Sequence, residues 1–159
     1  MKRLILCLAA LSLLLCLAGC SDQEENNCNF YYLRTSDTIR YGREDAIIAP
    51  VSRNISGQNA DLSYLLQLYL EGPSEEGFRS PIPQGTYLLS TLWEEDTLIL
   101  VFSREFSVLS NIELTLAGAC LTATCHDLAG AERIQIRSND QIYDFDLHNF
   151  TFLEVSTGQ

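Results

Sequence analysis

The first 20 residues change from apolar to polar at a single cysteine, and this change decides which part of the chain can fold. Lys2 and Arg3 give a short basic start, and an uncharged apolar run follows from Leu4 to Leu17. A helix needs about 20 apolar residues to cross roughly 30 Å of hydrocarbon, so this run is too short to span a membrane. A basic start followed by a short apolar run is typical of a secretion signal. The pattern predicts that residues 1–19 are a signal peptide and leave the mature chain.

The end of this run predicts a lipid anchor. Leu17, Ala18, Gly19 and Cys20 resemble the bacterial lipobox, in which a signal peptidase recognises the small residues and cuts before a cysteine whose sulfur carries diacylglycerol. Buried lipid methylenes contribute about 0.8 kcal/mol each, so two or more acyl chains give stable anchoring. The alternative is an ordinary signal peptide that contains a cysteine by coincidence. We expect Cys20 to be the lipidated amino terminus.

The charge of the remaining chain excludes one broad class of partners. Removing the first 19 of the 159 residues leaves 140, with eight arginines, no lysine and 21 acidic residues, for a formal charge of about −13. Nucleic acid and anionic lipid headgroups bind clustered positive charge. The sequence therefore predicts no nucleic-acid partner, and membrane contact only through the lipid. We expect residues 20–28 to be a polar tether and residues 29–159 to form one domain on the extracytoplasmic face of the cell membrane.

A first helix is predicted from apolar periodicity. Apolar side chains recur at helical spacing from Leu62 to Leu70, behind a candidate cap at Asn59. Gly72 and Pro73 follow, and they end a helix because one supplies a left-handed position and the other cannot continue the hydrogen-bond ladder.

A second helix is predicted to begin at Ser110, because Ser110 and Glu113 have the spacing of a capping box. Its polar stripe is narrow, so we expect the helix to be largely buried, with Ile112 among the covered residues. The stripe consists of Thr115, Gly118, Thr122 and His126.

Strand-like runs occupy the rest of the chain. Pro50 argues for an edge strand or a bulge, and the acidic residues 94–96 read as the turn of a hairpin. The run that follows this turn is apolar on both faces, which predicts a central strand with cover on both sides. The expected fold is α/β of the α+β kind: one compact domain with a mixed sheet and two helices, in the order β-β-α-β-β-α-β-β. The runs are Asn29–Thr35, Asp45–Arg53, Thr86–Trp93, Thr97–Ser103, Glu132–Ser138 and one or two more after residue 139.

From about Asn29 to Asp140 the chain resembles the GerMN domain of spore-germination and sporulation lipoproteins. Three segments carry the resemblance: "LEGP" at the end of the first helix, "PIPQGT" before the hairpin, and "FSREF" after its second strand. Each has a structural reason, since the residues end a helix, turn the chain or anchor the core. The family usually has a Thr-Leu pair late in the second helix and a glycine in the last hairpin, where this chain has Thr124-Cys125 and Ser138-Asn139-Asp140. The residues of these motifs are Gly72, Pro73, Pro81, Pro83, Gly85, Phe102 and Phe106.

The resemblance implies an α/β domain displayed outside the cytoplasmic membrane, with a structural or assembly role in sporulation, spore germination or the cell envelope. It also implies a similarity to ring-building domains of secretion-like channels. These expectations come from the resemblance and not from the chemistry of particular residues.

The residues that could do chemistry are poorly arranged for it. His126 and His148 lack a ligand partner at metal-binding spacing. Cys120 and Cys125 would point about 140° apart on a helix and should not bridge, and neighbouring Cys125 and His126 would point about 100° apart. With Cys28, three cysteines follow the anchor, so at least one thiol is free or pairs with another chain. We expect no enzyme activity, no metal and no cofactor.

Two classes of function stay open. The first is an assembly module that binds a protein partner or copies of itself, and arginines near the opening strands are candidates for that contact because their planar fork pairs with carboxylates. The second is a ligand-binding lipoprotein that captures a wall fragment or a small germinant, which aromatics around a cavity would favour. The arginines are Arg34, Arg40 and Arg43, and the aromatics are Tyr41, Phe78 and Tyr143.

Overall fold

The computed structural model describes residues 27–35, 46–55 and 60–150. The α+β class is confirmed, and the predicted order of elements holds apart from the added two-residue strand β3. No helix within the described residues is long and apolar enough to cross a membrane. The elements are β1 (Asn27–Arg34), β2 (Ile48–Asn54), α2 (Leu62–Leu70), β3 (Phe78–Arg79), β4 (Leu88–Glu94), β5 (Thr97–Phe102), the 3-10 helix η1 (Arg104–Val108), α3 (Asn111–Ala129), β6 (Arg133–Ser138), β7 (Gln141–Asp146) and the 3-10 helix η2 (Leu147–Asn149).

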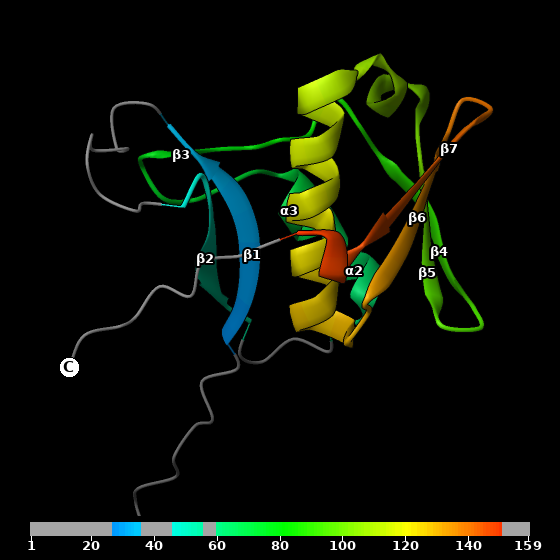
Figure 1. Cartoon of the computed structure of the whole chain (residues 1–159). Helices are drawn as coiled ribbons and strands as arrows, with labels where there is room; N and C mark the ends of the chain where they lie inside the picture. Colours follow the sequence, from blue (N-terminus) through cyan, green and yellow to red (C-terminus); the bar gives the residue numbers. More distant parts are fainter. Residues whose placement is uncertain (1–26, 36–45, 56–59, 151–159) are drawn as a thin grey trace, which may run out of the picture.

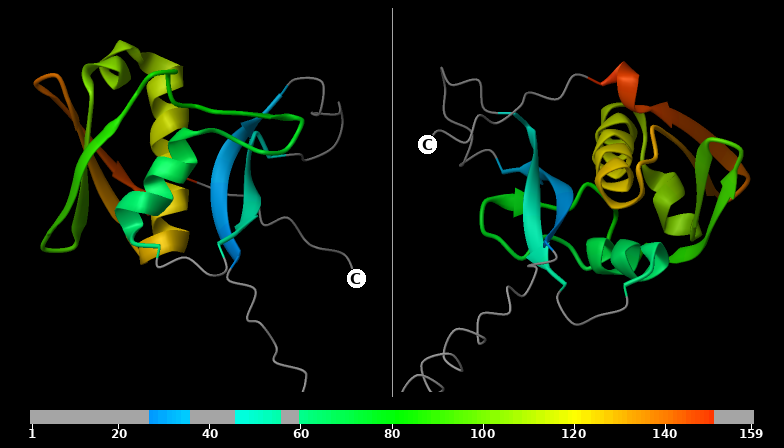
Figure 2. Two further views of the ribbon diagram at one scale, coloured as in Figure 1. Left: turned by 180° about the vertical axis from the view of Figure 1, so that it is seen from behind. Right: turned by 90° about the horizontal axis from the view of Figure 1, so that it is seen from below.

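The two α-helices lie between two separate sheets (Figures 1 and 2). On one side is an antiparallel sheet in the order β2-β1-β3, and on the other a four-stranded sheet in the order β4-β5-β6-β7. In the second sheet β5 and β6 are parallel, while the outer pairs are antiparallel. The sequence predicted one mixed sheet. The strands divide into two sheets because α3 is apolar on most of its circumference and needs cover on opposite sides.

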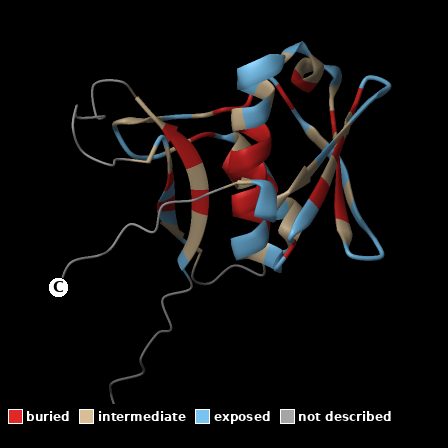
Figure 3. Ribbon diagram, in the orientation of Figure 1, coloured by how far each residue is buried: buried red, intermediate tan, exposed pale blue. Residues whose placement is uncertain are grey.

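The middle of α3 is buried all round (Figure 3). Residues 117–125 are buried without interruption, so the prediction of a largely buried helix is confirmed. The predicted polar stripe is exposed only near its ends. Within it, Thr122 donates from its hydroxyl to the carbonyl of Gly118 at 2.7 Å, which satisfies the buried hydroxyl. The hydroxyl of Thr124 accepts a 3.0 Å hydrogen bond from the backbone N–H of Tyr31, and so ties α3 to β1.

The first turn of α2 is capped by a different residue from the one predicted. Asp61 is the N-cap, and its carboxylate accepts from the N–H of Tyr64 at 2.7 Å. Asn59 lies outside the described residues, and it is two positions too early because the helix begins at Leu62. The predicted end is confirmed: Gly72 follows the last turn with a φ of +93°.

The first turn of α3 lacks the predicted capping box. Ser110 occupies the N-cap position, but its side chain makes no capping hydrogen bond. The next residue, Asn111, has a φ of +49°, which turns the chain away from the geometry that a capping box requires. The same turn leaves Ile112 75% exposed, against the prediction that it is covered.

Aromatic pairs fill the core between the sheets. Tyr32 of β1 and Tyr69 of α2 stack with ring centroids 4.9 Å apart, and the Tyr32 hydroxyl donates to the Tyr69 carbonyl at 2.9 Å. Phe102 of β5 and Phe106 of η1 stack at 5.2 Å, and both are almost fully buried. These two phenylalanines are the core anchors that the sequence predicted.

Arg53 of β2 holds the end of α2. Its guanidinium donates to the carbonyls of Leu68 at 3.1 Å and Gly72 at 2.8 Å, so it satisfies acceptors that a helix end leaves free. The guanidinium also lies over the ring of Phe30, 5.8 Å from its centroid. An ion pair with the exposed Glu71 completes the arrangement at 3.5 Å.

We expect Arg53→Met to lower the free energy of unfolding by about 2 kcal/mol, because methionine keeps an apolar stem but loses two charged hydrogen bonds to backbone carbonyls. Urea unfolding at unchanged slope measures this. Glu71→Gln is the matched control: it breaks only the exposed ion pair and should cost less than about 0.5 kcal/mol. Equal costs for the two variants would show that the ion pair, rather than the bonds to the helix end, provides the stability.

Candidate functional site

The predicted lipid-anchor residues lie outside the described residues. Leu17, Ala18, Gly19 and Cys20 belong to the segment before Asn27, so the lipid anchor stays a prediction. β1 begins two residues earlier than the expected start of the domain, and Cys28 therefore pairs with Arg53 inside a strand instead of lying in the tether. Arg40, Tyr41 and Arg43 also lie outside the described residues.

The three cysteines of the described residues are free thiols. Cys120 and Cys125 are fully buried in α3. Burial raises the pKa of Cys125 to about 12 and raises the pKa of Cys120 as well. Partial burial and the nearby carboxylate of Asp127 raise the pKa of Cys28. The thiolate is the reactive form, so these environments make all three poor nucleophiles at neutral pH.

The two histidines are exposed and belong to different elements. His126 lies in the last turn of α3, and His148 lies in η2, with its Nε2 3.7 Å from a carboxylate oxygen of Glu132. Among residues 27–35, 46–55 and 60–150, no three His, Cys, Asp or Glu side chains are grouped so that they could hold a metal ion.

The motif residues have structural positions. Gly72 needs its positive φ, and its carbonyl binds Arg53, as described above. Gly85 has a φ of +84° in the turn where the N–H of Thr86 donates to the carbonyl of Pro83 at 3.2 Å. Pro81 is buried and Pro73 is partly buried. These residues, with Phe102 and Phe106, shape the fold and form no shared site.

Among the described residues, no helix covers the outer face of the four-stranded sheet, which we call the open face. Both helices lie against the other face (Figures 1 and 2). Leu98, Leu100 and Ile136 point into the core, and strand residues alternate, so their neighbours point outward. The open face consists of Ser90, Leu92 and Glu94 of β4, Thr97, Ile99 and Val101 of β5, Arg133, Gln135 and Arg137 of β6, and Ile142, Asp144 and Asp146 of β7.

The open face corrects one prediction about β5. This strand is central, as predicted, but in the described part of the chain helices cover only one of its faces. Ile99 points outward and is still only 1% exposed. It sits between Leu92 of β4 and Gln135 of β6 in the register of the sheet, and these neighbours shield it. The apolar pattern predicted a covering element on each face of β5. On the open face, the side chains of the neighbouring strands shield Ile99 instead.

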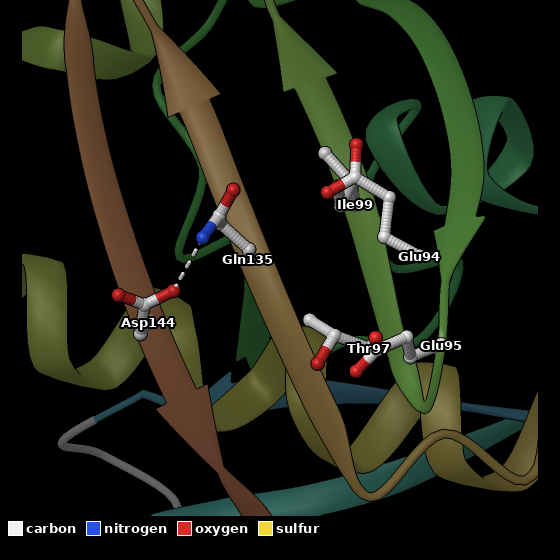
Figure 4. Close-up of a pocket in the computed structure, with 6 residues that line it drawn as sticks. All are labelled: Glu94, Glu95, Thr97, Ile99, Gln135 and Asp144. Carbon is white, nitrogen blue, oxygen red and sulfur yellow. Dashed lines mark hydrogen bonds between the residues drawn. The ribbon is translucent and has the colours of Figure 1, made fainter.

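A hollow of about 570 Å³ lies on the open face over Ile99. Figure 4 shows Glu94 and Glu95 on the side of the β4–β5 turn and Asp144 on the side of β7. Gln135 lies between them and donates from its amide to Asp144 at 2.7 Å. The lining residues are Glu94, Glu95, Thr97, Ile99, Gln135 and Asp144.

The arginines of the open face are paired within the sheet. Arg137 donates from Nε to Gln135 at 2.6 Å and lies 3.5 Å from a carboxylate oxygen of Glu94. Arg133 pairs with Asp96 of the turn. A smaller hollow of about 310 Å³ adjoins the first one and shares Thr97 and Asp144 with it. The surface can therefore accept hydrogen-bond donors and cations, and its described residues include no cysteine or histidine.

The sequence predicted only part of the open face. It indicated a solvated turn at residues 94–96 and no function on β6. On β7 it indicated only Tyr143, as a candidate cavity aromatic, and Tyr143 instead faces the core, where its ring lies 6.3 Å from that of Phe106. The signal was present in "RIQIRS", where polar residues alternate with buried isoleucines, as expected for a sheet with one uncovered face. Which strands lie beside β6 depends on long-range pairing, which the alternation does not show.

The fold defines the chain as a compact α+β domain in which a three-stranded and a four-stranded sheet enclose two helices. The chain belongs to the Germane family, which is described as sporulation and spore germination and whose model matches residues 29–144. This confirms the resemblance noted in the sequence. A comparison with curated proteins found no match.

Two solved structures are similar in fold. One is the first GerMN domain of the sporulation protein GerM from Bacillus subtilis, with a TM-score of 0.54 and 18% identity over 71% of this chain and 82% of that one. The other contains the tandem GerMN domains of the same protein, with a TM-score of 0.54, 17% identity, and coverage of 78% of this chain and 43% of that one. The chain thus spans less than half of the tandem structure. Membership of the Germane family supports a role related to sporulation or spore germination.

Proposed function

We propose that the chain is a lipid-anchored, non-catalytic assembly module on the extracytoplasmic face of the cell membrane, acting in sporulation, spore germination or the cell envelope. The family match over residues 29–144 supports the biological setting. The sequence Leu17-Ala18-Gly19-Cys20 supports the anchor. The module would contact another extracytoplasmic protein or further copies of itself.

One observation carries the assembly role: the buried cysteine thiols lie apart from the uncovered sheet face. Cys120 and Cys125 are buried inside α3 with raised pKa values, whereas the open face carries amides, carboxylates and paired arginines. A nucleophile and its base must lie within hydrogen-bond reach of each other at a surface that substrate can enter. An uncovered sheet face with exposed apolar and charged side chains is instead suited to contact with a macromolecule.

The alternative is a ligand-binding lipoprotein, and the hollow of about 570 Å³ favours it. Its lining argues against a typical ligand pocket. Ile99 is the one apolar residue among the six that line it, while pockets for small molecules are mostly apolar with a few polar groups. We therefore place this function second.

The test uses cells in which the gene is deleted and variants are returned. We expect the deletion to lower the yield of heat-resistant spores, and we expect His126→Ala/His148→Ala to restore it as fully as the natural chain, because neither histidine takes part in catalysis. Thermal unfolding of the double variant checks that it folds. A lost phenotype at unchanged thermal stability would contradict a non-catalytic role, and a tight small-molecule ligand in a purely monomeric protein would favour the alternative.

A further inference from the structure

We propose that the open face binds a basic segment of a partner protein, with its lysine or arginine side chains in the hollow between the β4–β5 turn and β7. The inference rests on the proposed assembly function and names the chemistry of the partner and the surface that it meets.

The carboxylates around the hollow are far enough apart to bind two or more separate cationic groups. Glu94 and Glu95 stand at the β4–β5 turn, and Asp144 stands on β7 at the far side of the hollow (Figure 4). Neighbouring strands lie about 4.8 Å apart, so the two to three strand spacings between the β4–β5 turn and β7 put Glu94 and Glu95 roughly 10–14 Å from Asp144. That distance is too long for the ligands of one metal ion, and it suits successive basic side chains that cross the sheet.

The charge that remains after internal pairing is negative. The open face and its turn carry five acidic residues, at positions 94, 95, 96, 144 and 146, against the two arginines Arg133 and Arg137. The arginines are engaged with Asp96 and Glu94, while Asp144 accepts only the neutral amide of Gln135 among the hydrogen bonds of the described residues. Within the same residues Glu95 forms no ion pair. These last two carboxylates are available to a cation from outside.

The apolar part of the open face suits the stems of basic side chains. Leu92 is 37% exposed and Ile142 is 59% exposed, and they lie on the two edge strands with Ile99 between them. Lysine and arginine pack their methylenes on apolar surface while the charged end meets a carboxylate. Apolar contact at both edges argues for a protein segment, because a small amine or a simple ion would leave these side chains uncovered.

The first test is photo-cross-linking in sporulating cells with the full chain. A photoreactive residue replaces Ile142 on the open face, and in a matched control it replaces Ile47 before β2, which is similarly exposed at 55%. We expect an adduct with another protein from Ile142 and little or none from Ile47. Mass spectrometry of the adduct should locate the linked peptide in a segment rich in lysine or arginine.

The second test removes negative charge from the hollow with substitutions that keep the size and shape of each side chain. Glu95→Gln/Asp144→Asn removes two negative charges from the hollow, and Glu75→Gln/Glu76→Gln removes two from an exposed stretch before β3. The purified chains are titrated with a fluorescent oligolysine peptide at low ionic strength. We expect the hollow variant to bind about fivefold more weakly and the control to bind as the natural chain does. In cells the hollow variant should lose the Ile142 adduct, while the control keeps it. The natural chain and the two double variants should share one thermal unfolding midpoint.

Three results would overturn the inference. They are an adduct that the hollow variant leaves intact, an adduct with a second copy of this acidic chain, and an adduct from Ile47 alone. In each of these cases the assembly role stands, because a protein contact has been found. If neither position yields a protein adduct and a small amine is recovered from the hollow, the proposed function fails together with the inference.

Discussion

Replacing Gly118 with alanine is expected to lower the free energy of unfolding by about 2 kcal/mol, although alanine is the better helix former. A methyl group at this position would overlap Cε1, Cδ1 and Cζ of the Phe145 ring. Alanine gains about 1 kcal/mol in a helix interior, but overpacking a well-filled core costs about 1–3 kcal/mol, and overlap with three ring atoms puts the cost here near the upper end of that range. The rigid ring packs against the core from β7, so it must shift together with its strand, and the overpacking cost should exceed the gain.

The measurement is a double-mutant cycle with Phe145→Leu, read by urea and thermal unfolding. A loss of about 2 kcal/mol corresponds to a fall of roughly 8 °C in the unfolding midpoint for a domain of this size. In the Phe145→Leu background, which replaces the ring, Gly118→Ala should cost much less or become stabilising. An alanine variant as stable as the natural chain would contradict the close approach of α3 to β7, and so would an equal loss in both backgrounds.

Gly118 shows what the sequence could not reveal about packing. Read along the helix, it falls among threonines and a histidine, and the pattern put it on a polar stripe. In the structure β7, which lies more than 20 residues further along the chain, crosses α3 at this point, and only a residue without a side chain leaves room for Phe145. The neighbour that decides such a position is distant in sequence, so local periodicity cannot identify it.

Local signals predicted most of the elements. The end of α2 at Gly72, the hairpin of β4 and β5, and Phe102 and Phe106 in the core follow from residues within a few positions of each other. The helix starts were less accurate, since a cap depends on the φ and ψ of one residue, as the shift to Asp61 and the turned Asn111 show. The division into two sheets could not be read from the chain, because it depends on which strands pair over long distances.

The sequence indicated the separate parts of the candidate site, but it did not show that they lie together in space. The acidic turn and the alternating strand β6 are visible in the sequence, and each on its own is typical of a solvated surface. β5 pairs with β6 in parallel, and this pairing brings the acidic turn and β6 side by side. The parallel pairing is possible because α3 connects the two strands. The same pairing brings Asp144 of β7 to the hollow.

Replacing Cys20 with serine is expected to abolish lipid attachment and to leave a precursor 19 residues longer than the mature chain. The thioether that holds diacylglycerol needs the cysteine sulfur, and a peptidase that cuts before lipidated cysteine should not process an unmodified chain. Palmitate labelling and gel mobility in growing cells measure both effects. The expected change is complete because no later cysteine follows small residues at the end of the apolar run.

Cys28→Ser is the matched control for this prediction, since it removes the next cysteine from a strand of the folded domain rather than from the anchor. It should be labelled and processed like the natural chain. Normal cleavage of Cys20→Ser together with palmitate labelling would contradict the anchor, while normal cleavage of both variants without any label would indicate an ordinary signal peptide. In the latter case the domain would lose its confinement near the membrane, and a weak contact of its open face would need a higher partner concentration to be populated.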